Sequence, residues 1–128
     1  MIWSQNKETM SFKFEELKVW QKSLELTLMI HDLTLRFPKD ELYILTSQIK
    51  RAADSVSLNI AEGSTGQTDA EFNKFLGYAL RSAIEVVSCL HIGLKRNIIS
   101  KADFENNYNL TSEIIKMIQA LRKSLKQS

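Results

Sequence analysis

Four long stretches of this 128-residue chain repeat apolar side chains at steps of three and four residues, with short breaks between them. Such spacing places the apolar side chains on one face of an α-helix. We expect helices over about 14–36, 39–62, 68–97 and 100–126. With one proline and four glycines, the chain has few residues that would interrupt them. Helices on the order of 35–45 Å joined by short connections must run antiparallel, which predicts an all-α, up-down-up-down four-helix bundle.

The apolar lines of these four segments are the predicted core. The first comprises Leu17, Trp20, Leu24, Leu28, His31 and Leu35; the second comprises Leu42, Leu45, Ile49, Ala52, Val56 and Ile60. The third comprises Phe72, Leu76, Ala79, Ala83, Val86, Leu90 and Leu94; the fourth comprises Phe104, Tyr108, Thr111, Ile115, Ile118 and Leu125.

The breaks contain residues typical of helix ends. Pro38 ends the first helix, because the residue before proline avoids the helical region. Gly63 is expected to cap the second helix at its C-terminus. Thr68 and Ser100 are expected to cap the N-termini of the third and fourth helices. Residues 1–12 are expected to form a flexible leader before a bundle over 13–128, with Met1 or Met10 as the start.

A single cysteine, Cys89, excludes an internal disulfide and agrees with a cytoplasmic location. The apolar runs are too short to predict a membrane span, and the first residues lack a secretion signal.

The second helix carries a polar stripe beside its apolar line. It consists of Gln48, Arg51, Ser55, Asn59 and Glu62. A solvated helix surface is one interpretation. Short Ser and Asn side chains are mediocre helix formers that gain little by facing water, so we favour a polar seam within the bundle or between subunits. Antiparallel register predicts that Ser82 and Glu85 of the third helix meet Gln48 and Arg51.

Several short motifs together resemble a known family. They are Phe14-x-x-Leu17-x-Val19-Trp20, Phe37-Pro38-x-x-Glu41, Gln48-Ile49-x-Arg51-Ala52-Ala53-x-Ser55, Asn59-Ile60-Ala61-Glu62-Gly63, Glu71-Phe72-x-x-Phe75-Leu76 and Ser82-x-x-Glu85. Over roughly residues 14–121 the chain resembles the bacterial 23S ribosomal RNA intervening-sequence proteins, a family that includes accessory proteins of diversity-generating retroelements.

The resemblance implies an up-down bundle that assembles into a ring-shaped homo-oligomer, in known cases a pentamer. The retroelement members bind nucleic acid and a reverse transcriptase, which makes RNA, DNA and such an enzyme expected partners. This chain departs from the family pattern at two places. It lacks the arginine that many relatives have after the turn glycine, and it has Arg81 where a small residue is common.

Catalytic and metal sites find no support in the sequence. No phosphate loop, nucleophile elbow or paired-carboxylate motif is present. His31 and His91 lack the Glu-x-x-His spacing of metal-binding bundles. We therefore expect no enzymatic activity, no metal and no cofactor.

Basic residues gather in the last third of the chain. Residues 86–128 hold seven basic and three acidic side chains, against ten and twelve in residues 1–85. The candidate phosphate contacts are Lys95, Arg96, Lys101, Lys116, Arg122, Lys123 and Lys126. Phosphate contact needs only positive charge, so these residues alone are a weak signal. The resemblance implies a nucleic-acid-associated accessory protein, and the alternative is a structural or protein-interaction bundle with no nucleic-acid role.

Overall fold

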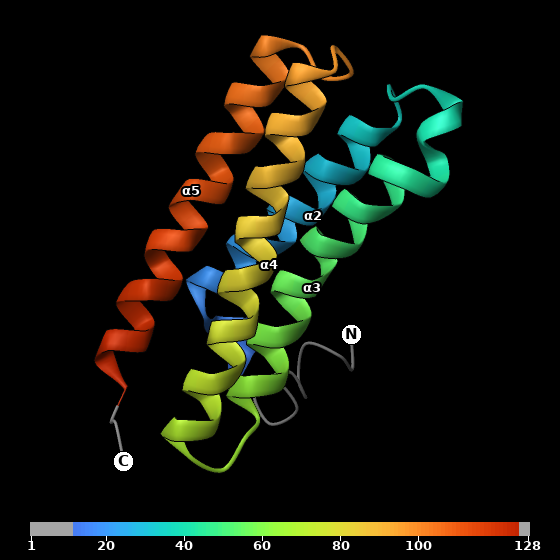
Figure 1. Ribbon diagram of the computed structural model, residues 1–128. Helices are drawn as coiled ribbons and strands as arrows, with labels where there is room; N and C mark the ends of the chain where they lie inside the picture. The colour runs from blue at the N-terminus through green and yellow to red at the C-terminus, as the bar shows by residue number, and fades with distance from the viewer. Residues whose placement is uncertain (1–11, 126–128) are drawn as a thin grey trace, which may run out of the picture.

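Four antiparallel helices make up the bundle in the computed structural model, which describes residues 12–125 (Figure 1). They are α2 (Lys18–Thr34), α3 (Ser47–Ser64), α4 (Asp69–Lys95) and α5 (Lys101–Ser124). Three short helical turns precede α2 and α3: η1 (Lys13–Glu16), η2 (Lys39–Glu41) and η3 (Leu42–Thr46). The described part of the chain contains no strand, so the predicted all-α bundle is confirmed. Lys126 and most of the expected leader lie outside the described residues.

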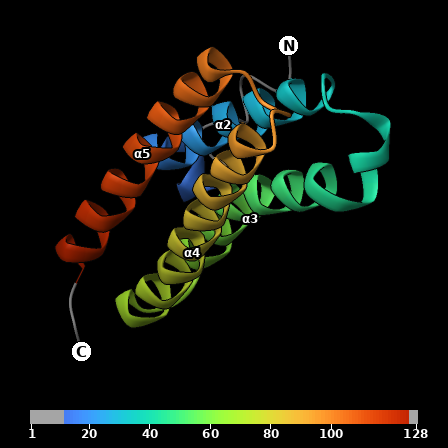
Figure 2. The same ribbon diagram turned by 45° about the horizontal axis from the view of Figure 1, so that its top comes forward.

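Each helix packs against two others. Helix α3 contacts α2 and α4, while α5 contacts α4 and α2. The α2–α3 and α4–α5 connections lie at one end of the bundle and the α3–α4 turn at the other (Figure 1). Figure 2 shows α3 and α5 on opposite sides, so that each helix keeps one face toward the common core and another toward the outside.

The predicted core line of the first helix is wrong for its three later leucines, whereas Leu17 and Trp20 are partly buried and pack against the core. Leu24, Leu28 and Leu35 are 39%, 70% and 82% exposed. The line that packs into the core is instead Val19, Leu26, Ile30 and Leu33. Helix α2 carries two apolar lines, and α3 and α5 cover only one of them. Periodicity identified a real line but not the one that the neighbouring helices bury.

The core lines of α3, α4 and α5 agree better with the structure. On α3 the predicted line is buried from Leu45 to Ile60, but Leu42 is 50% exposed. The expected continuous helix over 39–62 begins instead with a 3₁₀ turn and a π-helical turn, and α-helical bonding starts at Ser47. On α5 the buried residues are Asn107, Thr111, Ile114 and Ile118. Tyr108 and Ile115 of the predicted line therefore lie at its edge.

Both predicted N-terminal caps are confirmed. Thr68 Oγ1 accepts from Glu71 N–H at 3.1 Å, and Ser100 Oγ accepts from Asp103 N–H at 3.1 Å. The predicted Gly63 cap is wrong, because Gly63 lies within the last turn of α3 without a positive φ. A Cβ at Gly63 would lie 2.6 Å from Phe75 Cβ. The glycine therefore permits close packing of α3 on α4 next to their turn.

Five small polar side chains are buried and bonded to their own helices. They are Ser23, Thr34, Ser57, Asn107 and Thr111. Each donates to a backbone carbonyl three or four residues earlier. Such a bond satisfies the donor without a partner on another helix. The hydrophilic residues that are fully buried are therefore not those of the predicted α3 stripe.

Helix α4 is long and apolar enough, by length and composition alone, to cross a membrane, contrary to the sequence expectation. One such helix is weak evidence, because a core helix passes the same test. Here Leu76, Ala83, Val86 and Leu90 of α4 are fully buried in the bundle core.

Candidate nucleic-acid interface

The predicted polar stripe of α3 lies on the surface of the single chain. Gln48, Arg51 and Glu62 are exposed, and Ser55 and Asn59 are partly buried. Asn59 Nδ2 donates to the backbone O of Ser55 at 2.8 Å and to its Oγ at 3.1 Å, so that pair is satisfied within α3. The prediction of a seam buried inside the bundle is therefore wrong for most of the stripe. The alternative, a seam between subunits, stays a prediction.

One contact of the stripe crosses to α4, in a slightly different register from the one predicted. Gln48 Nε2 donates to Glu85 Oε2 at 3.0 Å, where the sequence argument paired Gln48 with Ser82. Arg51 reaches only Ser47 Oγ, at 3.5 Å on its own helix, and not Glu85 or Ser82. The register differs because the α3–α4 turn is centred later than Thr65, at 65–68 between the two helices.

Two of the predicted phosphate contacts are held by other side chains. Arg96 donates to both carboxylate oxygens of Glu41, at 2.6 and 3.3 Å, and Glu41 is only 4% exposed. Arg122 Nε donates to Asn73 Oδ1 at 2.8 Å. The Arg96–Glu41 contact therefore holds the η2 turn against the end of α4. Glu41 compensates the charge of Arg96. Arg122 has a neutral partner and keeps its net charge.

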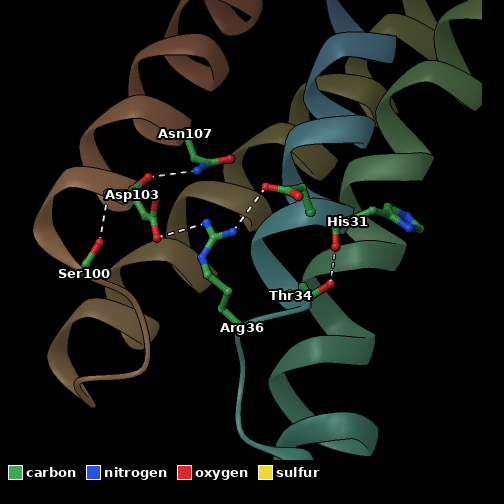
Figure 3. A network of polar contacts seen from close by, with 7 residues as sticks. His31, Thr34, Arg36, Ser100, Asp103 and Asn107 are labelled. Atoms are coloured by element: carbon green, nitrogen blue, oxygen red, sulfur yellow. Dashed lines mark hydrogen bonds and ion pairs between the residues drawn. The ribbon is translucent and has the colours of Figure 1, made fainter.

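Helix α2 pairs with two of the three carboxylates in the basic C-terminal region. Arg36 contacts Asp103 at 3.0 Å and Asp32 at 3.2 Å (Figure 3). The hydrogen bond to Asp103 is the main reason why the pKa of Arg36 is raised. Lys22 lies 3.8 Å from Glu113. Because these pairs face α2, the cations on the opposite side of α5 have no acidic partner among residues 12–125.

Three of the four positions in one seven-residue row of α4 carry cations. Lys74, Arg81, Ser88 and Lys95 are all exposed, and seven residues correspond to about two helical turns. On α5 the same interval relates Lys101, Tyr108, Ile115 and Arg122. Contacts between Arg122 and Asn73, and between Tyr108 and His91, bring the two rows together. We call the surface formed by these two rows and His91 the α4–α5 face.

The cations of this face have few partners. Among the residues that the structure describes, no ion pair or hydrogen bond is recorded for the side chains of Lys74, Arg81, Lys95 or Lys101. Lys116 and Lys123 are likewise exposed on α5, beyond the Arg122 row. The structure thus places Lys95, Lys101 and Arg122 along one face, with Lys116 and Lys123 beside it.

Lys74 and Arg81 of this face were not among the phosphate contacts predicted from the sequence. Residues 1–85 carry more acidic than basic side chains, so net charge indicated only the last third of the chain. The seven-residue spacing of Lys74 and Arg81, with Lys95 two intervals further, was the available signal. Using it required knowing which helix lies beside that row.

An aromatic cluster lies between the cations at one end of the α4–α5 face. The His91 and Phe104 ring centroids are 4.9 Å apart, and those of Phe104 and Tyr108 are 5.4 Å apart in a stacked arrangement. His91 is exposed, and Tyr108 is 37% exposed. Many proteins bind single-stranded nucleic acids with aromatic rings that stack on the bases and cations that contact the backbone.

No cluster of three or more His, Cys, Asp or Glu side chains able to hold a metal occurs among residues 12–125. His31 Nε2 contacts Asp54 Oδ1 at 3.2 Å, and His91 packs on rings. Cys89 is buried, which raises the pKa of its thiol to about 11 with a smaller contribution from Glu85. A thiol in this state is a poor nucleophile at neutral pH.

Comparison with known proteins identifies the family. The family model for the 23S rRNA-intervening sequence protein matches residues 15–120. The chain belongs to this family. A crystal structure of a protein of unknown function from the S23 ribosomal protein family of Bacteroides thetaiotaomicron is similar, with 27% identity and a TM-score of 0.75. That similarity covers 83% of this chain and 99% of the other chain. No curated protein matches this chain.

The family membership agrees with the resemblance drawn from the motifs. Neither the family description nor the structural relative names a catalytic activity. The Asn-Ile-Ala-Glu-Gly segment at 59–63 now has a physical explanation at its last position, because Gly63 allows Phe75 to pack directly on α3.

Proposed function

We propose that this protein is a non-enzymatic, homo-oligomeric accessory protein that binds nucleic acid through its α4–α5 face. The observation that carries the proposal is the set of exposed cations on that face without acidic partners among the described residues. They are Lys74, Arg81, Lys95 and Lys101, and Arg122 joins them through a neutral partner. The family description, which names an insert in 23S rRNA, supports RNA as the first ligand to test.

Two of the three carboxylates of α5 are on the side that faces α2. Asp103 pairs with Arg36, just after α2, and Glu113 lies near Lys22 of α2. Glu105 is the one remaining carboxylate of α5. Lysine and arginine that are not already paired can neutralise phosphates and release counterions, which makes binding strongest at low salt. An oligomer would repeat this face and multiply its field.

The test is binding of RNA and DNA oligonucleotides across a salt series by fluorescence anisotropy. The Lys74→Met/Arg81→Met/Lys95→Met triple variant should weaken binding at every sequence tested. It should also reduce the slope of log affinity against log salt by about 0.7–1 for each lost phosphate contact. The matched control is Lys13→Met/Lys18→Met/Lys39→Met, which removes three exposed lysines near α2. Equal loss in both triple variants, or no binding by the wild-type protein at low salt, would overturn the proposal.

Assembly is supported by the second apolar line of α2. Leu24, Leu28 and Leu35 flank His31, whose ring contacts Asp54 of α3, and Leu58 lies one turn beyond Asp54. We call this surface the α2–α3 face. Leu28, Leu35 and Leu58 are 70%, 82% and 66% exposed, and grouped apolar side chains of this kind mark interaction sites. We infer that other copies of the chain cover it, and a measured mass of one chain at micromolar concentration would contradict this.

The second candidate function is a structural or protein-interaction bundle without a nucleic-acid role. The exposed leucines of the α2–α3 face favour it, because they would serve a protein partner equally well. The two candidates differ in the α4–α5 cations. Under the second candidate, replacing those cations changes neither assembly nor any binding property.

A further inference from the structure

Three aromatic rings lie at one end of the α4–α5 face, and two of them project outside the core. His91 comes from α4, and Phe104 and Tyr108 come from α5. The Tyr108 ring is stacked on Phe104 at an interplanar angle of 24° and lies edge-on to His91, with centroids 6.1 Å apart. Phe104 packs against the core, while His91 and Tyr108 remain exposed. Phe104 thus supports an outer layer of two rings.

Two cations lie near these rings, both toward the α4–α5 connection, because α4 and α5 are antiparallel. Lys95 follows His91 by about one helical turn, roughly 6 Å along α4. Lys101 precedes Tyr108 by about two turns, roughly 10 Å along α5. Neither lysine has a recorded ion pair with a described residue. Rings with two cations on one side match a nucleotide that stacks its base on the rings and directs its phosphate toward the α4–α5 connection.

We propose that His91 and Tyr108 form a stacking site for an unpaired base, with Lys95 and Lys101 holding the phosphate on the side of the α4–α5 connection. The ligand class is single-stranded nucleic acid, because bases within a duplex are already stacked on each other and their faces are covered. The inference rests on the proposed function and gives it a location and a strand preference. Stacking on an aromatic side chain contributes sequence-tolerant affinity, so no particular base is required.

A structural role is the competing explanation for the rings. Aromatic pairs stabilise a fold by about 0.5–1.5 kcal/mol beyond their buried area, and this cluster joins α4 to α5. The two explanations differ in their dependence on the base. A purely structural ring would affect folding and would not distinguish a normal oligonucleotide from one that lacks bases.

The experiment compares two single-stranded oligonucleotides of equal length and charge, one normal and one with several abasic positions. Tyr108→Ala should lower affinity for the normal oligonucleotide about 5- to 100-fold and leave affinity for the abasic one unchanged. Tyr108→Phe should retain binding. The control is Tyr43→Ala, which removes a tyrosine that is 90% exposed before α3, far along the chain from these rings. RNA and DNA versions should respond alike, because the base ring is common to both.

Each outcome has a separate meaning. Equal loss on both oligonucleotides, or no loss on the normal one with helix content intact, would overturn the stacking site while leaving phosphate-driven binding in place. A Lys95→Met/Lys101→Met variant should weaken the binding of both oligonucleotides equally, and its failure to do so would refute the phosphate contact at the α4–α5 connection. Binding of neither oligonucleotide by the wild-type protein at low salt would instead refute the proposed function itself.

Discussion

The two sides of the bundle expose opposite kinds of side chain. The α2–α3 face presents leucines around the His31–Asp54 contact, whereas the α4–α5 face presents lysines, arginines and aromatic rings. Helical periodicity predicted the helices on both sides. It did not predict that the leucines of α2 are exposed or that the cations of α4 and α5 share one face. This difference is the basis of the two proposals, another copy of the chain on the apolar side and a nucleic acid on the cationic side.

We expect the largest effect, on assembly, when acidic side chains replace leucines of the α2–α3 face. Leu28→Glu/Leu35→Glu replaces two leucines that another copy would bury, each contributing about 1.5–3 kcal/mol when fully covered. We expect the assembly to dissociate to single chains with unchanged helix content, measured by light scattering and circular dichroism. The matched variant on the other face, Lys95→Glu/Lys101→Glu, should leave the mass unchanged. Dissociation by the second variant and not the first would reverse the assignment of the two faces.

Adjacent cations at the end of α4 provide a second comparison. Arg96→Met leaves the carboxylate of Glu41 buried without its partner, and we expect a loss of about 2–3 kcal/mol in the free energy of unfolding. Lys95→Met should change stability by less than about 0.5 kcal/mol but weaken nucleic-acid binding. Urea denaturation and anisotropy measure the two properties. A destabilised Lys95 variant would show that the α4–α5 cations are structural.

The Arg96–Glu41 contact also shows which parts of the structure the sequence determined. Glu41 belongs to the quoted Phe37-Pro38-x-x-Glu41 motif, and Arg96 was assigned to phosphate contact. No local pattern joins two residues 55 positions apart. Helix number, order and both N-terminal caps followed from spacing and capping residues, because those signals act over three or four positions. The choice between the two apolar lines of α2 depends on tertiary packing, which periodicity does not contain.

The two glycines that contact a neighbouring helix should respond to alanine with opposite signs. Gly63→Ala places a Cβ 2.6 Å from Phe75 Cβ, which cannot swing away, so we expect a loss of about 1–3 kcal/mol from overpacking of α3 on α4. Gly77 lies inside α4, and its nearest neighbours are Arg122 side-chain atoms at 3.4 Å. Gly77→Ala should therefore stabilise the protein by about 0.5–1 kcal/mol through helix propensity. A thermal melt of each variant measures both, and destabilisation by Gly77→Ala would reveal tighter α4–α5 packing than the structure shows.

The smallest effect is a change in the free energy of unfolding on substitution in the polar stripe of α3. It distinguishes a solvated surface from a seam between subunits. Asn59 bonds only to Ser55 of its own helix, so Asn59→Ala in the dissociated Leu28→Glu/Leu35→Glu background should cost less than about 0.5 kcal/mol. In the assembled protein the same substitution should cost about 1–3 kcal/mol if another subunit buries the stripe, because partner groups would lose their hydrogen bonds. Equal small effects in both backgrounds would assign the stripe to solvent. Short Ser and Asn side chains on a helix surface would then need no buried seam to explain them, since bonds within one helix already satisfy them.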